Sequence, residues 1–229
     1  RNMKWKGVDI ATKGLLALTQ PEPQTPEMEV EVFPIEGSDK SEVVEKGYRP
    51  YTLSVKFAIF DPDTYLDSAM EFLRGSGALI SDDDTAKYWN ARIVKQSKFE
   101  RMMPSSKIRE SVVEFFVKDP YRYKVGETDT TLTSPGNVTN AGTVNSLPLL
   151  KVTGTGTVVM TIGGRSFTYV FGAEPYVYID SDSQDAYYLT TKKNANMTGS
   201  FPYLTPGTNA ISWTGTVTQL IITPRSRYL

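Results

Sequence analysis

The sequence predicts a mainly β protein with one helix: an N-terminal α+β domain with an antiparallel sheet, followed by a C-terminal antiparallel β-sandwich. Three observations lead to this fold class. Several segments of the first half alternate apolar and polar residues, as half-buried strands do. A single segment carries the start and stop signals of a helix. Beyond residue 124, short strands punctuated by Gly, Pro and Asn follow one another without helical periodicity, which is typical of a sandwich.

A change in charge density marks the expected domain boundary. Residues 1–124 hold 19 Lys+Arg and 20 Asp+Glu, whereas residues 125–229 hold 6 of each. The change follows the β-branched and aromatic run Val112–Val117, and we expect Asp119-Pro120 to end that strand because proline cannot donate to a ladder. We therefore assign 1–124 and 125–229 to two domains. The junction residues are Asp119, Pro120, Tyr121 and Tyr123.

Four further strands are predicted in the first domain, all before Val112–Val117. Trp5–Ile10 is a short strand with a glycine turn, and Met28–Val32 alternates as a half-buried strand. Thr52–Ile59 is the clearest, and Trp89–Val94 alternates in the same way. The apolar face of the clearest strand consists of Leu53, Val55, Phe57 and Ile59.

The predicted helix lies between these strands. Asp61 is its expected cap, Pro62 occupies its first position, and Gly75 ends it after Leu73-Arg74. Its apolar residues recur at helical spacing, so we interpret them as core rather than as a cofactor site. They are Leu66, Ala69, Met70 and Leu73.

Two segments of the first domain fit neither strand nor helix. Gln20–Pro26 is rich in proline and therefore extended and stiff, either an exposed connector or an arm that packs on a neighbouring subunit. Gln96–Arg109 is polar, long and irregular, either an exposed hairpin tip or an intersubunit contact. The candidate interface residues are Pro21, Pro23, Pro26, Arg101, Met102 and Met103.

The second domain contains three hairpin-like pairs of segments. Gly163-Gly164 is a strong two-residue turn signal for the first of them. We expect a turn at Thr214-Gly215 in the last. The pairs are Thr157–Ile162 with Arg165–Phe171, Tyr176–Asp180 with Ala186–Thr190, and Asn209–Trp213 with Val217–Thr223.

The residue types argue against most catalytic and metal chemistry. The chain has no Cys and no His, which excludes disulfides, Cys/His zinc sites and His-assisted nucleophiles. The consecutive Asp82–Asp84 lack the alternate spacing of a calcium loop, so we interpret them as a solvated hairpin turn. Asp180, Asp182 and Asp185 are interpreted as turn formers. We expect no enzyme activity, no cofactor and no metal.

Charge and hydropathy also restrict the partners. Near-zero net charge in both halves argues against a nucleic-acid binder, and no apolar run approaches the ~20 residues of a membrane span. The N-terminus lacks the apolar stretch of a signal peptide, so nothing directs the chain to secretion. Trp213, Tyr203 and Tyr176 could form a sugar-binding platform, but Trp213 alternates with Ile211 and we interpret it as core.

A set of motifs, in order along the chain, resembles the distal tail protein (Dit) family of long non-contractile-tailed bacteriophages. Each motif is ordinary loop or strand chemistry, and the ordered set carries the resemblance. The motifs are Asp119-Pro120-Tyr121-Arg122-Tyr123, Asn140–Thr143, Pro148–Gly154, Phe201–Ile211 and Ile222–Leu229.

The resemblance implies a structural virion protein located at the phage tail tip and assembled in the bacterial host cytoplasm. That family forms a hexameric ring that joins the tail-tube protein to the baseplate hub or tail-associated lysin. Its N-terminal domains make the ring, and its galectin-like (jelly-roll-like) C-terminal sandwiches face outward, where a receptor-binding protein is a further conceivable partner. We therefore expect ring formation to reside in residues 1–124. Two alternatives stay open: a carbohydrate-binding β-sandwich for host-surface attachment, and a tail-tube-like protein.

Overall fold

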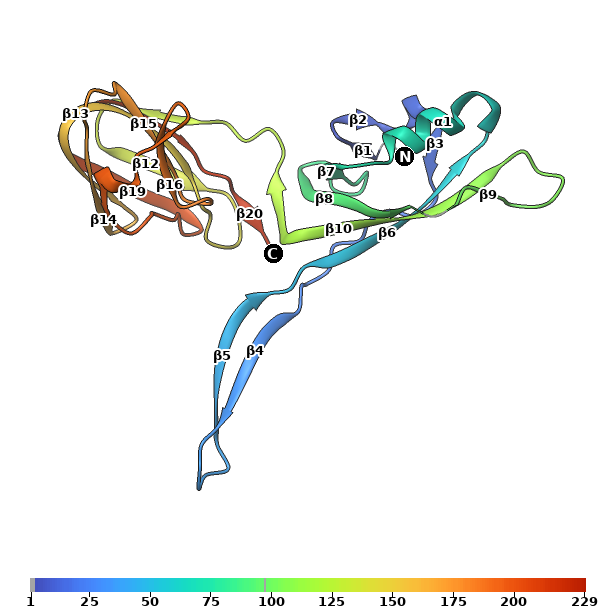
Figure 1. Cartoon of the computed structure of the whole chain (residues 1–229), viewed down its shortest axis with the longest axis horizontal. Helices are drawn as coiled ribbons and strands as arrows, with labels where there is room; N and C mark the ends of the chain where they lie inside the picture. The colour runs from blue at the N-terminus through green and yellow to red at the C-terminus, as the bar shows by residue number, and fades with distance from the viewer. Residues whose placement is uncertain (1–2, 97) are drawn as a thin grey trace. The chain divides into compact units, whose positions relative to one another are not determined.

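The computed structural model describes residues 3–96 and 98–229. The chain divides into two compact units, the first reaching to Arg122 and the second comprising Tyr123–Tyr228, with Leu229 grouped with the first (Figure 1). Below they are called unit 1 and unit 2. Both consist mainly of antiparallel strands, and the described residues contain one α-helix.

Unit 1 is built on a curled antiparallel sheet whose strand order is β2-β1-β7-β8-β10-β6-β3, with β9 pairing at one end of β10. A second, two-stranded sheet consists of β4 (Met28–Pro34) and β5 (Ser41–Tyr48). The strands of the large sheet are β1 (Lys4–Trp5), β2 (Val8–Asp9), β3 (Leu15–Ala17), β6 (Tyr51–Ile59), β7 (Ser76–Ile80), β8 (Lys87–Gln96), β9 (Glu100–Arg101) and β10 (Arg109–Lys124).

The core of unit 1 lies on one face of this sheet. The alternation predicted for β6 is confirmed, because its four inward residues are at most 5% exposed. Antiparallel pairing sets Val55 opposite Val113 and Leu53 opposite Phe115 on β10. Phe115 also meets Trp5 edge to face, with ring centroids 5.1 Å apart. The alternation predicted for Trp89, Ala91 and Ile93 on β8 is confirmed as well.

The helix α1 (Pro62–Phe72) covers part of this core, and a short 3-10 helix, η1 (Ile10–Lys13), lies beside it. Pro62 occupies the first position as predicted, but Asp61 makes no side-chain capping bond, because its backbone is outside the usual capping geometry. Ala69 and Leu73 are fully buried as predicted, but Met70 is 37% exposed, so the prediction that it belongs to the apolar stripe is wrong.

The prediction that Asp119-Pro120 ends a strand is wrong, because β10 continues through both residues to Lys124. The ladder between β10 and β6 stops at Val117, opposite Tyr51. Pro120 lies beyond that point, so β6 requires no N–H from it.

Unit 2 contains ten strand segments and the 3-10 helix η2 (Asn194–Asn196). The predicted hairpins β13–β14, across Gly163-Gly164, and β15–β16 are confirmed. The strands are β11 (Thr130–Leu132), β12 (Gly136–Asn140), β13 (Leu149–Ile162), β14 (Arg165–Val170), β15 (Tyr176–Asp180), β16 (Asp185–Tyr188), β17 (Thr191–Lys192), β18 (Met197–Gly199), β19 (Gly207–Thr223) and β20 (Arg227–Tyr228).

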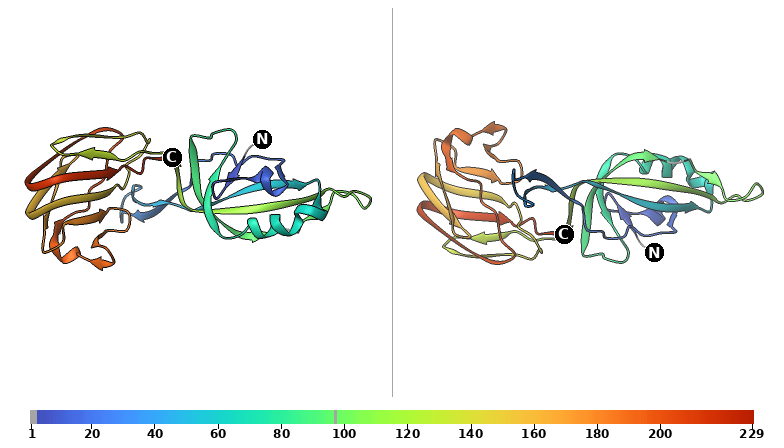
Figure 2. Two further views of the ribbon diagram at one scale, coloured as in Figure 1. Left: turned by 90° about the horizontal axis from the view of Figure 1, so that it is seen from above. Right: turned by 90° about the horizontal axis from the view of Figure 1, so that it is seen from below.

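Two long strands, β13 and β19, join the layers of unit 2 (Figure 2). Near their middle the register shifts twice, between Thr153 and Gly154 and between Thr155 and Val159. On one side of the shift β13 pairs with β15, and on the other side it pairs with β14. Strands that bend at a bulge and pass from one layer to another make the corner of a sandwich, which encloses a second apolar core.

The turn predicted at Thr214-Gly215 is wrong, because β19 is one continuous strand from Gly207 to Thr223. Gly215 has a φ of 91° and lies within the irregular part of the β13–β19 ladder, where its backbone approaches Thr157. A glycine inside a strand pattern marks a bulge or a close backbone approach as readily as a turn, and here the bulge is present.

A buried carboxylate links β14 to the segment after β17. The side chain of Glu174 is 3% exposed; it accepts hydrogen bonds from the Tyr169 hydroxyl at 2.8 Å and the Gly172 N–H at 3.2 Å, and from the Lys193 ammonium at 3.2 Å. Burial by itself would raise the pKa of this carboxyl, but the backbone, hydroxyl and ammonium donors together lower it to about 2.

We expect unit 2 to lose stability in acid through this group. Because the folded pKa of Glu174 lies below the unfolded value of 4.5, its contribution is complete above pH 4.5 and disappears as the pH falls through about 2. The contribution is on the order of 1–3 kcal/mol. Urea unfolding of Glu174→Gln at several pH values should show a smaller decrease in stability over that range than the wild type. The exposed Asp182→Asn is the control, and an unchanged pH profile for Glu174→Gln would contradict the assignment.

Candidate functional site: an assembly surface on unit 1

The most exposed element of unit 1 is the hairpin of β4 and β5, which extends away from the sheet (Figure 1). The half-buried strand predicted at Met28–Val32 is a strand, but the prediction of half burial is wrong. Val30, Val32 and Val43 are 48%, 55% and 56% exposed. Cross-strand pairing puts Val32 beside Val43 and Val30 beside Glu45, so these three valines share one face.

The opposite face of the hairpin alternates acidic and apolar residues, whereas Glu45 lies beside Val30 on the valine face. Glu31 pairs across the strands with Val44, and Phe33 pairs with Glu42. Lys46 forms an exposed ion pair with Glu31 at 2.6 Å, and Arg49, just beyond β5, pairs with Glu29 at 3.6 Å. Residues 28–48 contain six acidic and two basic residues, a net charge of −4.

The hairpin of β4 and β5 has little stability of its own. A two-stranded hairpin is at best marginally stable in water, because it buries too little apolar surface to offset its ordering entropy. Within the described residues no element covers the valine face, and contiguous exposed apolar surface in a protein marks an interaction site. The hairpin therefore has the properties of a segment whose apolar face is covered by another molecule.

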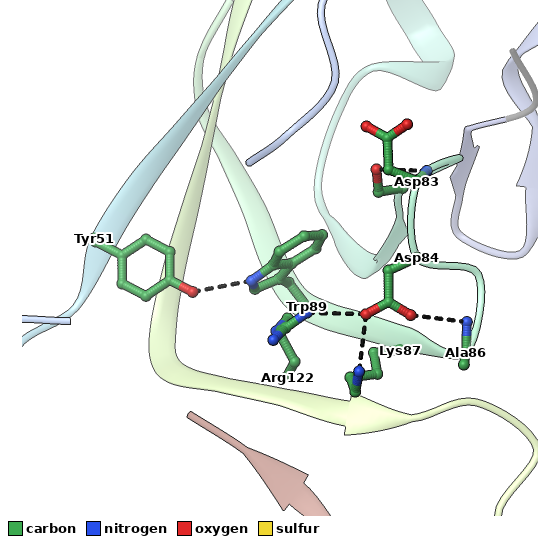
Figure 3. A network of polar contacts seen from close by, with 8 residues as sticks. Tyr51, Asp83, Asp84, Ala86, Lys87, Trp89 and Arg122 are labelled. Carbon is green, nitrogen blue, oxygen red and sulfur yellow. Dashed lines mark hydrogen bonds and ion pairs between the residues drawn. The ribbon is translucent and has the colours of Figure 1, made fainter. Parts of the chain in front are cut away.

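The root of the hairpin is held by a polar network at one end of the sheet (Figure 3). Tyr51, the first residue of β6, accepts a hydrogen bond from the Trp89 indole at 2.9 Å, and burial raises its pKa. Asp84 pairs with Lys87 and with Arg122, each at 3.0 Å. Burial opposes the ionised form of Asp84, but these partners and the Ala86 N–H lower its pKa. Asp84, in the acidic turn Asp82–Asp84, therefore forms ion pairs with two cations of unit 1.

A second exposed segment connects β8 to β10. We define the methionine loop as residues 98–108; it contains Met102 and Met103, which are 54% and 58% exposed. Its backbone is ordered by a hydrogen bond from Met102 N–H to the Ile108 carbonyl at 3.1 Å and by one from the Arg101 guanidinium to the Pro104 carbonyl at 3.2 Å. The segment carries three basic residues and one acidic residue.

The structure places the candidate interface residues in two different settings. Arg101, Met102 and Met103 lie together on the methionine loop, exposed to solvent. Pro23 is also exposed, but Pro21 and Pro26 are buried. The adjoining Gln20 is buried too and accepts hydrogen bonds from Ser81 and Asp82, so this end of the proline-rich segment is attached to unit 1.

Sequence reasoning missed β5 and therefore the hairpin as a whole. The signal was present: the turn residues Gly37-Ser38-Asp39 follow the alternation of β4, and the apolar Val43-Val44 comes after them. The predicted junction residues Asp119, Pro120, Tyr121 and Tyr123 are all part of the continuous strand β10, and the division into units 1 and 2 falls between Arg122 and Tyr123.

Unit 2 carries a tyrosine-rich face whose rings are partly exposed. Tyr178 stacks on Tyr187 at 5.2 Å, and Tyr176 meets both Tyr178 and Tyr188 edge to face. The Lys151 ammonium lies 4.5 Å from the Tyr176 ring centroid. The proposed sugar platform of Trp213, Tyr203 and Tyr176 does not form as a unit on this face, because Trp213 packs against the core as predicted.

Comparison with known proteins gives matches to structures alone. No family model matches the sequence, and no curated protein matches it. The structure is similar to the Dit protein of phage SPP1, with a TM-score of 0.75 and 15% sequence identity. The match covers 100% of this chain and 99% of the SPP1 chain. That protein is described as a hub of the adsorption apparatus in phages that infect Gram-positive bacteria. The chain has the fold of a phage distal tail protein.

The distal-tail fold extends over both units, because the match covers the whole chain. A weaker similarity, with a TM-score of 0.50 and 8% identity, covers 94% of this chain and 91% of a chain of the phage P2 baseplate in its calcium-activated conformation. The predicted fold class and the resemblance to the Dit family are therefore confirmed at the level of fold. Among the described helices, none is both long and apolar enough to cross a membrane.

Proposed function

We propose that this chain is a structural, non-catalytic protein of a phage tail tip, and that it forms a hexameric ring between the tail-tube protein and the baseplate hub or tail-associated lysin. The observation that carries the proposal is the distal-tail fold over the full chain, shared with a protein described as a hub. In this assignment unit 1 makes the ring and unit 2 is a peripheral module. The location is the virion, after assembly in the host cytoplasm.

The exposed hairpin supports the assignment of the ring to unit 1. A closed ring repeats one heterologous contact, so every subunit needs two different surfaces that fit each other. The valine face of β4 and β5 is apolar surface that no described residue of the same chain covers. Unit 2 has a different composition, with partly exposed tyrosines beside Lys151, and Tyr is enriched in protein interfaces. We assign that face to docking of a further tail component such as a receptor-binding protein.

Electron microscopy of the purified full-length chain, combined with light scattering at several concentrations, tests the proposal. We expect closed rings with six-fold symmetry. The double variant Val32→Asp, Val43→Asp should not form them, because each interface would then bury unpaired carboxylates at a cost of several kcal/mol. Both side chains are exposed within the chain, so the variant should keep the folded structure of unit 1.

Val170→Asp is the matched control, since Val170 is 47% exposed on unit 2 and should not affect ring formation. Open tubes of indefinite length would favour the tail-tube alternative. A chain that stays monomeric even when it is mixed with its tail-tube and hub partners would contradict the proposed function.

A further inference from the structure

Unit 1 carries two exposed segments of opposite charge. The hairpin of β4 and β5 has a net charge of −4, and the methionine loop (residues 98–108) has a net charge of +2. Glu42 and Glu45 on the hairpin are exposed, as are Lys98 and Arg101 on the loop. Each segment also exposes apolar side chains, valines on the hairpin and methionines on the loop.

The two segments leave unit 1 from opposite ends of one ladder. The methionine loop leads into Arg109, which pairs with Ile59, and the hairpin leads into Tyr51, which pairs with Val117. The ladder consists of nine residue pairs, counting the two end pairs. At about 3.4 Å per residue the ladder is about 27–30 Å long. A hairpin and a loop separated in this way do not cover each other within one chain, and Figure 1 shows them pointing in different directions from the sheet.

We propose that the hairpin of one subunit docks on the methionine loop of the next subunit around the ring. The inference rests on the proposed function and names the surface that receives the hairpin. A donor and an acceptor at opposite ends of the same rigid ladder give the head-to-tail contact that a closed ring repeats. The occupant of both surfaces is therefore a second copy of this chain.

The chemistry of the two surfaces is complementary in two respects. The valine face is a flat, β-branched surface, and methionine side chains are unbranched and flexible, so they can adapt to it. Glu45 lies on the valine face beside Val30 and would meet the cations of the loop, where opposite charge sets the register and increases the association rate. Contacts of this kind are screened over roughly 10 Å at 0.1 M salt, so assembly should weaken as salt increases.

Cysteine cross-linking tests the proposed contact directly, because the natural chain has no Cys and introduced thiols are the only ones present. The double variant Val43→Cys, Met102→Cys, treated with a short bis-maleimide under conditions that give rings, should produce a ladder of covalent species up to six subunits. Each single variant should stay monomeric on a denaturing gel. The pair Val43→Cys, Val8→Cys is the control, since Val8 lies on the edge strand β2, is 39% exposed and is not part of the contact.

Charge reversal gives an independent measurement. Glu45→Lys and the pair Lys98→Glu, Arg101→Glu should each raise the concentration for half-assembly roughly tenfold or more, and the variant with all three changes should assemble close to the wild-type concentration. Glu71→Lys on the exposed side of α1 is the control and should have no effect. Rings that form without a cross-linked ladder, or that tolerate both reversals, would overturn this inference and leave the proposed function intact. Absence of rings in the wild type and with its tail partners would instead count against the proposed function.

Discussion

Replacing Leu73 by alanine is expected to lower the free energy of unfolding of unit 1 by about 2–5 kcal/mol. Leu73 is fully buried at the C-terminal end of α1 and belongs to the core formed by β6, β8 and β10. Truncation removes its apolar contacts and leaves a cavity that a curled sheet can fill only partly. Urea unfolding monitored by hydrogen exchange in peptides of β6 and β10 would report on unit 1 separately from unit 2.

Met70→Ala is the matched control for Leu73→Ala. Both residues lie at the C-terminal end of α1, but Met70 is 37% exposed, so its truncation should change the stability by no more than about 0.5–1 kcal/mol. Equal effects of the two substitutions would show that α1 does not pack on the sheet, and the α+β arrangement of unit 1 would be wrong.

Gly215→Ala is expected to destabilise unit 2 by about 2–5 kcal/mol, through strain of about 1–2 kcal/mol and overpacking of about 1–3 kcal/mol. A side chain at a φ of 91° is strained by itself. The added Cβ would in addition collide with the backbone carbonyl oxygen of Thr157 on β13. That carbonyl belongs to the irregular part of the ladder that makes the corner of the sandwich, and it cannot move without disturbing the pairing of both long strands.

Gly156→Ala separates the two causes. Gly156 also has a positive φ, 69°, but nothing lies within 4 Å of a Cβ added there. Gly156→Ala should therefore lower the free energy of unfolding through backbone strain alone, by about 1–2 kcal/mol. Thermal and urea unfolding of both variants, with hydrogen exchange in peptides of β13 and β19, give the comparison. If Gly215→Ala lowers the free energy of unfolding by no more than Gly156→Ala does, then the close approach at the bulge does not contribute to the destabilisation.

Local patterns in the sequence were sufficient to predict the elements that depend on short-range signals. The alternation of Leu53, Val55, Phe57 and Ile59 predicted the buried face of β6, because a strand with one face in the core must alternate. Proline at the first position of α1 and the glycine turn between β13 and β14 were equally local signals. The polar and irregular segment Gln96–Arg109 was predicted to be an exposed hairpin tip or an intersubunit contact, and Met102 and Met103 on it are exposed within the chain.

Elements that depend on a distant partner were predicted less well. Pro120 is accommodated inside β10 because β6 no longer pairs with that part of the strand, which no local pattern shows. Gly215 has the residue type of a turn but belongs to a bulge. Only the pairing of β19 with β13 distinguishes the bulge from a turn. The Met28–Val32 alternation predicted a half-buried strand, and this was wrong because β4 pairs with β5 away from the core.

The sequence by itself determined the β-rich class, the single helix, the core faces of β6 and β8, and the resemblance to the distal tail proteins, because each depends on local periodicity or on motifs in order. Only the tertiary structure decided that β4 and β5 form an exposed hairpin and that the hairpin and the methionine loop lie at opposite ends of one ladder. The physical reason is that alternation reports which residues share a face, whereas strand pairing over long sequence separations decides what that face meets.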